Sequence, residues 1–205
     1  GSPTGAWDCP GCDLTEPPAD YRVRGTEIEL PNGERVASQL NVPGAFNVAN
    51  AACALAAAVE LGVPVPDALA GFTTVRSPAG RFAVAPIGDS LLRLVLSKNP
   101  AGWSESLPLL GSDPVILAID SVAADGKDVS WLWDVDFEQL RGRRVICSGP
   151  RAYDLAVRLD YGDVAHEVIG DIADAVRSVR GTTVPIDVIA TYTPFQKLLK
   201  MAGLR

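Results

Sequence analysis

Positive charge is scarce in this sequence, which has 18 lysines and arginines against 25 aspartates and glutamates. The formal charge of −7 argues against a nucleic-acid-binding protein, because phosphate recognition requires a basic face. Long apolar runs are also lacking, since the longest, residues 51–59, falls short of the roughly 20 residues that span a bilayer. No signal segment opens the chain. These absences predict a cytoplasmic protein without a transmembrane segment.

Cysteine and histidine are also few, with four cysteines and a single histidine, His166. Cys53 and Cys147 fall in segments that we expect to be core, which fits a reducing compartment better than a disulfide scaffold. Cys9 and Cys12 form a C-x-x-C pair, which supplies half of the ligands of a tetrahedral zinc site. We expect either half of a zinc ribbon, a pair of free surface thiols or a redox pair.

Nucleotide-binding loops are missing as well. The sequence contains no G-x-x-x-x-G-K-[ST] phosphate loop and no G-x-G-x-x-G fingerprint. Any nucleotide chemistry must therefore take its phosphate cradle from residues outside these 205. Gly1 and Ser2 look like a cloning remnant, so we expect the chain to begin inside a longer natural protein.

The pattern of apolar residues changes near residue 80, where we place a domain boundary. Before it, three short strands are followed by an alanine-rich helix, which is apolar nearly all round and is therefore expected to be buried on most sides. After a hinge at residues 77–80, nearly all-apolar runs alternate with helices, which predicts a doubly wound α/β domain with a mostly parallel sheet. The expected strands are residues 21–24, 27–30, 35–40, 91–96, 115–119, 145–147 and 184–190. The expected helices are residues 47–61, 66–72, 103–110, 152–159, 172–179 and 194–201.

Two segments resemble elements of the Mur ligases. Residues 44–52, GAFNVANAA, resemble the G-x-H-N-x-x-N-x-x-A-A element, although Phe46 replaces the usual histidine. Asn47 and Asn50 are three residues apart and share one side of the first helical turn, and the resemblance implies that they lie beside the adenine of ATP. Residues 77–82, SPAGRF, resemble the hinge into the Mur ligase C-terminal domain, which implies a nucleotide-binding role for Arg81. A helix-capping asparagine and a surface arginine are the ordinary alternatives.

Four further segments, in the same order, resemble the MurT family within the Mur ligases: residues 96–102 (LSKNPAG), 124–134 (ADGKDVSWLWD), 148–152 (SGPRA) and 190–193 (ATYT). The first of them makes Asn99 a further nucleotide-binding candidate. General Mur ligases have an aspartate four residues before the Asn-Pro pair, where this sequence has Val95. That departure weakens the analogy to ordinary amino-acid-adding ligases.

The resemblance implies that residues 1–80 are the tail of a Mur ligase central ATPase domain with a half zinc ribbon, and that residues 81–205 are a Rossmann-like C-terminal domain. It further implies an ATP- and Mg²⁺-dependent ligase subunit that works with a GatD-like glutamine amidotransferase and amidates the D-glutamate of lipid II to D-isoglutamine. Zn²⁺ remains an open expectation. An amino-acid-adding or folate-type ligase without such a partner, and a docking module without nucleotide contact, are the alternatives. Lacking a phosphate loop, the chain alone is expected to bind ATP weakly and to hydrolyse none.

The loop at residues 121–129 is expected at the carboxyl end of the sheet, where α/β domains keep their sites. The resemblance implies that an aspartate from this region, Asp125 or Asp128, orients the histidine of the partner's Cys-His-Asp system. Turn chemistry and helix capping are the alternatives for the two residues. Trp131 and Trp133, which follow, mark either a protein interface or core packing. His166 has no nucleophile near it in sequence, and we expect a structural role.

Overall fold

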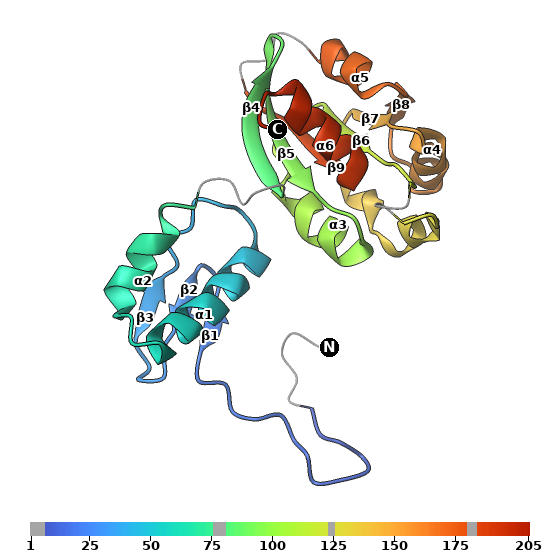
Figure 1. Ribbon diagram of the computed structural model, residues 1–205. Coiled ribbons are helices and arrows are strands. Elements are labelled where there is room, and N and C mark those ends of the chain that lie inside the picture. Colours follow the sequence, from blue (N-terminus) through green and yellow to red (C-terminus); the bar gives the residue numbers. More distant parts are fainter. Residues whose placement is uncertain (1–6, 76–80, 123–125, 180–183) are drawn as a thin grey trace. The chain divides into compact units, whose positions relative to one another are not determined.

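The computed structural model describes residues 7–75, 81–122, 126–179 and 184–205 (Figure 1). It divides into two compact units, the first comprising residues 1–40 and 45–73 and the second residues 41–44 and 74–205. The hinge expected at residues 77–80 lies outside the described residues, and the boundary near residue 80 stays a prediction. Among the residues that are described, no helix is long and apolar enough to cross a bilayer.

The first unit packs two helices on a small antiparallel sheet of order β1-β2-β3. Its elements are β1 (Arg22–Arg24), β2 (Glu27–Glu29), β3 (Arg35–Ala37), α1 (Ala45–Glu60) and α2 (Val65–Phe72). As expected, α1 ends before Gly62, whose φ of +86° suits a residue without a side chain.

The alanine-rich helix α1 is buried along one face only, which corrects the expectation of burial on most sides. Val48, Ala51, Ala52 and Leu55 are buried, whereas Cys53, expected in the core, is exposed. The reason is that an alanine-rich helix has no polar face, so its sequence does not indicate which of its sides contacts the sheet.

The second unit is built on a six-stranded sheet of order β4-β5-β9-β6-β7-β8. The β4–β5 pair is antiparallel and the remaining pairs are parallel, which confirms the predicted α/β class with a mostly parallel sheet. Every residue of β6, β7 and β9 is buried, as expected for strands covered on both faces. The strands are β4 (Phe82–Ile87), β5 (Ser90–Leu96), β6 (Val115–Ala118), β7 (Val145–Ser148), β8 (His166–Val168) and β9 (Ile186–Ala190).

Helices cover both faces of this sheet. One face carries α3, three 3-10 helices and α4 around the buried Trp103 and Phe137, and the other carries α5 and α6 around Phe195. The elements are α3 (Pro100–Ser106), η1 (Leu107–Leu109), η2 (Ser130–Asp134), η3 (Phe137–Leu140), α4 (Ala152–Tyr161), α5 (Ile172–Ser178) and α6 (Tyr192–Met201).

Candidate functional site

The carboxyl edge of the six-stranded sheet contains a topological switch point between β6 and β9. The chain leaves β6 toward the face of η2 and η3, and it leaves the neighbouring β9 toward the opposite face, where α6 lies. Ligands of open α/β sheets bind where neighbouring connections diverge in this way. The candidate site is therefore built from the segments that follow β5, β6, β7 and β9.

Hydrogen bonds fix the segments at this switch point. The Asp120 N–H donates to the Thr191 hydroxyl at 3.0 Å, and the Thr191 N–H donates to the carbonyl of Ala118 at 3.0 Å. The Asp120 carboxyl is largely buried and accepts from the Ser121 N–H at 2.7 Å. Asp120 is absent from the predicted site residues, and Thr191 was noted only as part of the segment 190–193. A polar residue directly after an all-apolar strand is a signal that could have identified both.

Two of the predicted nucleotide-binding residues lie at this same edge. The Arg81 carbonyl accepts from the Leu96 N–H at 2.9 Å. Arg81 therefore lies beside the last residue of β5, and Asn99 follows that residue three positions later. Both Arg81 and Asn99 are exposed. The Oδ1 of Asn99 accepts from the Gly102 N–H at 2.9 Å and caps α3, so the amide NH₂ is the group that Asn99 can offer to a ligand.

The other two, Asn47 and Asn50, lie on the first turn of α1 in the first unit. Asn47 is partly buried and Asn50 is exposed. Their spacing of three residues keeps both side chains on one side of the helix, as expected.

The loop after β6 carries an exposed carboxylate. Asp128 accepts from the Ser130 N–H at 2.8 Å and from the Ser130 hydroxyl at 2.9 Å, at the beginning of η2. These two hydrogen bonds lower the pKa of Asp128 below its ordinary value, so the side chain is an acceptor at neutral pH. Asp125, the other candidate of this loop, lies outside the described residues.

Cys9 and Cys12 lie in a tight turn. The Cys9 N–H donates to Leu14, and the Cys12 N–H donates to the carbonyl of Cys9 at 3.4 Å. Hydrogen bonds from the Gly11 backbone and the Cys12 side chain lower the pKa of Cys9, which favours a thiolate. Two thiols are half of a tetrahedral ligand set, and the described part of the chain holds no group of three or more metal-ligating side chains. The zinc site therefore stays a prediction.

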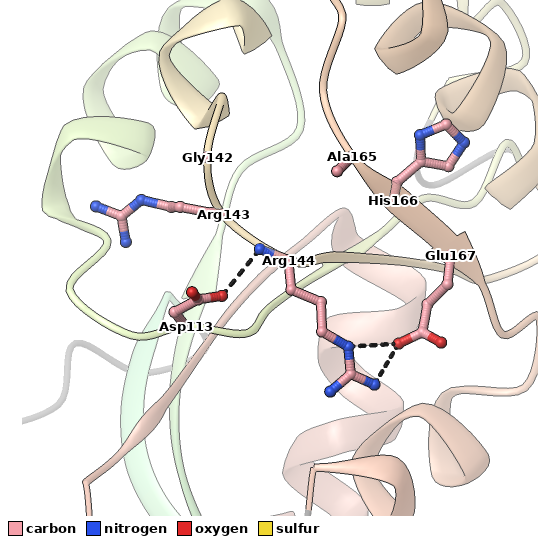
Figure 2. Close-up of a pocket in the computed structure, with 7 residues that line it drawn as sticks. All are labelled: Asp113, Gly142, Arg143, Arg144, Ala165, His166 and Glu167. Carbon is pink, nitrogen blue, oxygen red and sulfur yellow. Dashed lines mark hydrogen bonds and ion pairs between the residues drawn. The ribbon is translucent and has the colours of Figure 1, made fainter.

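A pocket of about 460 Å³ lies at the opposite edge of the sheet, before the first residues of β7 and β8 (Figure 2). The arginine side chains that line the pocket donate to carboxylates or carbonyls of the protein itself. Arg144 donates to Glu167 through Nε at 3.0 Å, and the Arg144 N–H donates to Asp113 at 2.9 Å. Arg143 donates to the carbonyls of Ser112 and Leu110, and Figure 2 shows its side chain directed away from Arg144. We interpret these contacts as structural ties between strands.

The chain is similar in sequence to ligases of the MurT type. The family model described as MurT ligase C-terminal matches residues 96–195. The lipid II isoglutaminyl synthase (glutamine-hydrolyzing) subunit MurT of Streptococcus pneumoniae is 33% identical over 170 residues, which cover 76% of this chain and 37% of that protein. This chain thus spans little more than a third of the length of that relative.

Solved structures share the fold. A pseudomurein peptide ligase type C from Methanothermus fervidus superposes with a TM-score of 0.65 at 15% identity, over 97% of this chain and 44% of that one. The UDP-N-acetylmuramate-alanine ligase MurC of Thermotoga maritima gives 0.56 at 13% identity, over 85% and 43%. These likenesses confirm the predicted Mur ligase-type fold.

Proposed function

We propose that this chain, whose residues 96–195 match the family model described as MurT ligase C-terminal, is the C-terminal portion of the ligase subunit of a lipid II isoglutaminyl synthase. Together with a GatD-like glutamine amidotransferase, the whole subunit converts the α-carboxylate of the D-glutamate in lipid II into the amide of D-isoglutamine. The S. pneumoniae relative, named as a subunit of a glutamine-hydrolyzing synthase, supports this proposal.

Amide formation from a carboxylate requires activation, because a carboxylate is a poor electrophile at neutral pH. ATP with Mg²⁺ supplies the phosphoryl group for that activation when bound. Phosphate and ribose oxygens of the nucleotide accept hydrogen bonds. The guanidinium of Arg81 and the NH₂ of Asn99 lie at one edge of the sheet and are suitable donors for these oxygens. Asn47 and Asn50 offer both a donor and an acceptor to adenine.

The exposed carboxylate in the loop after β6 is the observation that carries the proposed partnership. A glutamine amidotransferase with a Cys-His pair needs a carboxylate that holds the imidazole in its reactive orientation. Asp128 is exposed, ionised at neutral pH and held by Ser130, so it can accept a hydrogen bond from a histidine of a neighbouring protein. Asp125, in the same loop, is the second candidate for this role.

The test replaces each aspartate and measures glutamine hydrolysis by the partner. The full-length ligase subunit is prepared as Asp125→Asn, as Asp128→Asn and, for control, as Asp89→Asn, which alters an exposed aspartate in the turn between β4 and β5. Glutamate release by the glutaminase subunit is then followed with each variant at saturation. We expect one of the first two variants to lower kcat by roughly 10²- to 10⁴-fold, the range for loss of a triad carboxylate, while the control stays within twofold of the unmodified subunit.

Unchanged hydrolysis with both loop variants would exclude the shared catalytic centre. If glutamate release does not respond to the ligase subunit at all, the chain belongs to a ligase without an amidotransferase partner. If hydrolysis depends on the subunit while Arg81→Ala and Asn99→Ala leave its affinity for ATP unchanged, this portion is a docking module without nucleotide contact.

A further inference from the structure

The helix α4 buries one largely apolar face and leaves a second group of apolar side chains exposed. Its only cation, Arg158, is buried with 6% of its surface exposed, whereas Tyr153, Val157 and Tyr161 are 74%, 50% and 75% exposed. These three residues follow one another at intervals of four, so they form one stripe along the helix. Isolated exposed apolar residues are ordinary, but a continuous group of them indicates a contact surface.

The stripe is extended by an aromatic residue from η2. Trp133 is 54% exposed, and its ring meets that of Tyr161 edge to face with centroids 5.2 Å apart. The other tryptophan of this segment, Trp131, is partly buried and packs on Trp103 at 6.0 Å. Trp131 therefore follows the core alternative, whereas Trp133 keeps an exposed ring. We call Trp133, Tyr153, Val157 and Tyr161 the aromatic surface.

Buried contacts hold the two parts of the aromatic surface together. Arg158 of α4 donates to both carboxylate oxygens of Glu138 at 2.9 Å and to the carbonyl of Val135 at 2.8 Å. Its guanidinium also lies 5.6 Å from the ring centroids of Trp133 and Phe137. The segment 130–140 is thereby fixed on α4, so little conformational freedom remains to be lost when a partner binds.

The aromatic surface begins near the loop that carries Asp128. Helix α4 follows β7 directly, and its first turn lies at the carboxyl edge, where the Arg151 N–H donates to the carbonyl of Ile119 at 3.2 Å. Figure 1 shows α4 beside β7 and β8, at the side of the sheet away from β4. Trp133 is five residues from Asp128, which limits their Cα separation to about 17 Å. A protein that receives Asp128 in its active site therefore lies within reach of Trp133.

We propose that the aromatic surface is the docking site for the glutamine-hydrolysing subunit that uses the loop carboxylate. This proposal rests on the proposed function, which requires a partner at Asp128. Tyrosine and tryptophan are the residue types that dominate binding energy at interface centres. The exposed Asp134 and Asp160 border the surface, so the matching patch of the partner carries an apolar centre and a basic rim.

The test separates binding from catalysis. The dissociation constant of the full-length ligase subunit for the glutaminase subunit is measured by isothermal titration calorimetry, and kcat for glutamine hydrolysis is measured at saturation. We expect the double variant Trp133→Ala/Tyr161→Ala to weaken binding by at least 30-fold while kcat stays within twofold. Asp125→Asn and Asp128→Asn provide the opposite pattern, because one of them lowers kcat and leaves the dissociation constant within about threefold.

A matched pair of valines controls for nonspecific effects. Val157 on α4 and Val84 on β4 are both 50% exposed, and β4 is the far edge strand of the sheet. Val157→Arg should weaken binding at least tenfold, whereas Val84→Arg should leave it unchanged, with thermal unfolding confirming that both variants fold. Undiminished affinity in the double variant and in Val157→Arg would overturn the docking site.

Each proposal fails in its own way. If the surface variants bind weakly while both aspartate variants hydrolyse glutamine normally, the docking site stands and the shared catalytic centre is wrong. If sedimentation of the ligase subunit alone shows a dimer that Val157→Arg converts to monomers, the aromatic surface is a contact between two copies, and the proposed glutaminase docking is wrong.

Discussion

Among the glycines that the structure describes, Gly149, directly after β7, makes a very close backbone approach. Its φ is +89°, and a Cβ added there would lie 2.3 Å from the carbonyl oxygen of Ile119. Gly142 provides a matched comparison, since its φ is +83° but an added Cβ would have no heavy atom within 4 Å. The substitution Gly142→Ala therefore introduces backbone strain alone, whereas Gly149→Ala introduces the strain and a collision with the end of β6.

We expect Gly142→Ala to lower the free energy of unfolding by about 1–2 kcal/mol, the cost of a left-handed conformation for a residue with a side chain. Gly149→Ala should lower it by about 2–5 kcal/mol, because overpacking adds about 1–3 kcal/mol. Urea unfolding followed by tryptophan fluorescence measures both losses, since three of the four tryptophans lie in this unit. Equal losses in the two variants would refute the close approach at Gly149.

One further substitution and one chemical label test the packing of the same unit. The hydrogen bonds from Arg158 lower the pKa of Glu138 to about 2, so the pair stabilises the fold above the ordinary carboxyl pKa, and this stabilisation is lost as the pH falls toward 2. Glu138→Gln should lower the free energy of unfolding by about 1–2 kcal/mol at pH 7, a value reduced for screening of the partly exposed carboxylate. The difference in free energy of unfolding between the variant and the unmodified protein, measured by urea unfolding, should decrease below pH 4.5. A difference that does not depend on pH would contradict the pairing. Burial raises the pKa of Cys147 to about 12, so iodoacetamide at pH 8 should modify the exposed Cys53 and leave Cys147 unmodified until urea unfolds the protein, as mass spectrometry would show; equal rates would contradict the burial.

The sequence predicted the central parallel strands because an all-apolar run is typical of a strand that is covered on both faces. It did not predict β4, whose residues alternate between buried and exposed and include Pro86. Proline is tolerated there because β4 is an edge strand, a position that only the assembled sheet defines. The helix expected at residues 103–110 is divided into α3 and η1, because Pro108 has no N–H to continue α-helical hydrogen bonding.

Candidate site residues could be named from the sequence where they stand in a family motif, and could not be named where their contacts are distant in sequence. Asn99 and Arg81 stood in recognisable segments, and the β4–β5 pairing then places them at one edge. Asp120 meets Thr191 across 71 residues of chain, and no local pattern contains that contact. Arg158 illustrates the same limit, because its burial depends on Glu138 and Val135, which come from a different segment.

The hydrogen bond between Arg81 and Leu96 fixes where the beginning of β4 meets the end of β5. The chain resumes after residues 76–80 at the carboxyl end of a seven-residue strand, β5, which is about 23 Å long. The hydrogen bond at Leu96 therefore holds Arg81 at the end of the sheet where Asn99 also lies. A shift at the carboxyl end of β5 would move these two candidate nucleotide-binding residues together, whereas the turn between β4 and β5 lies at the opposite end of the strand.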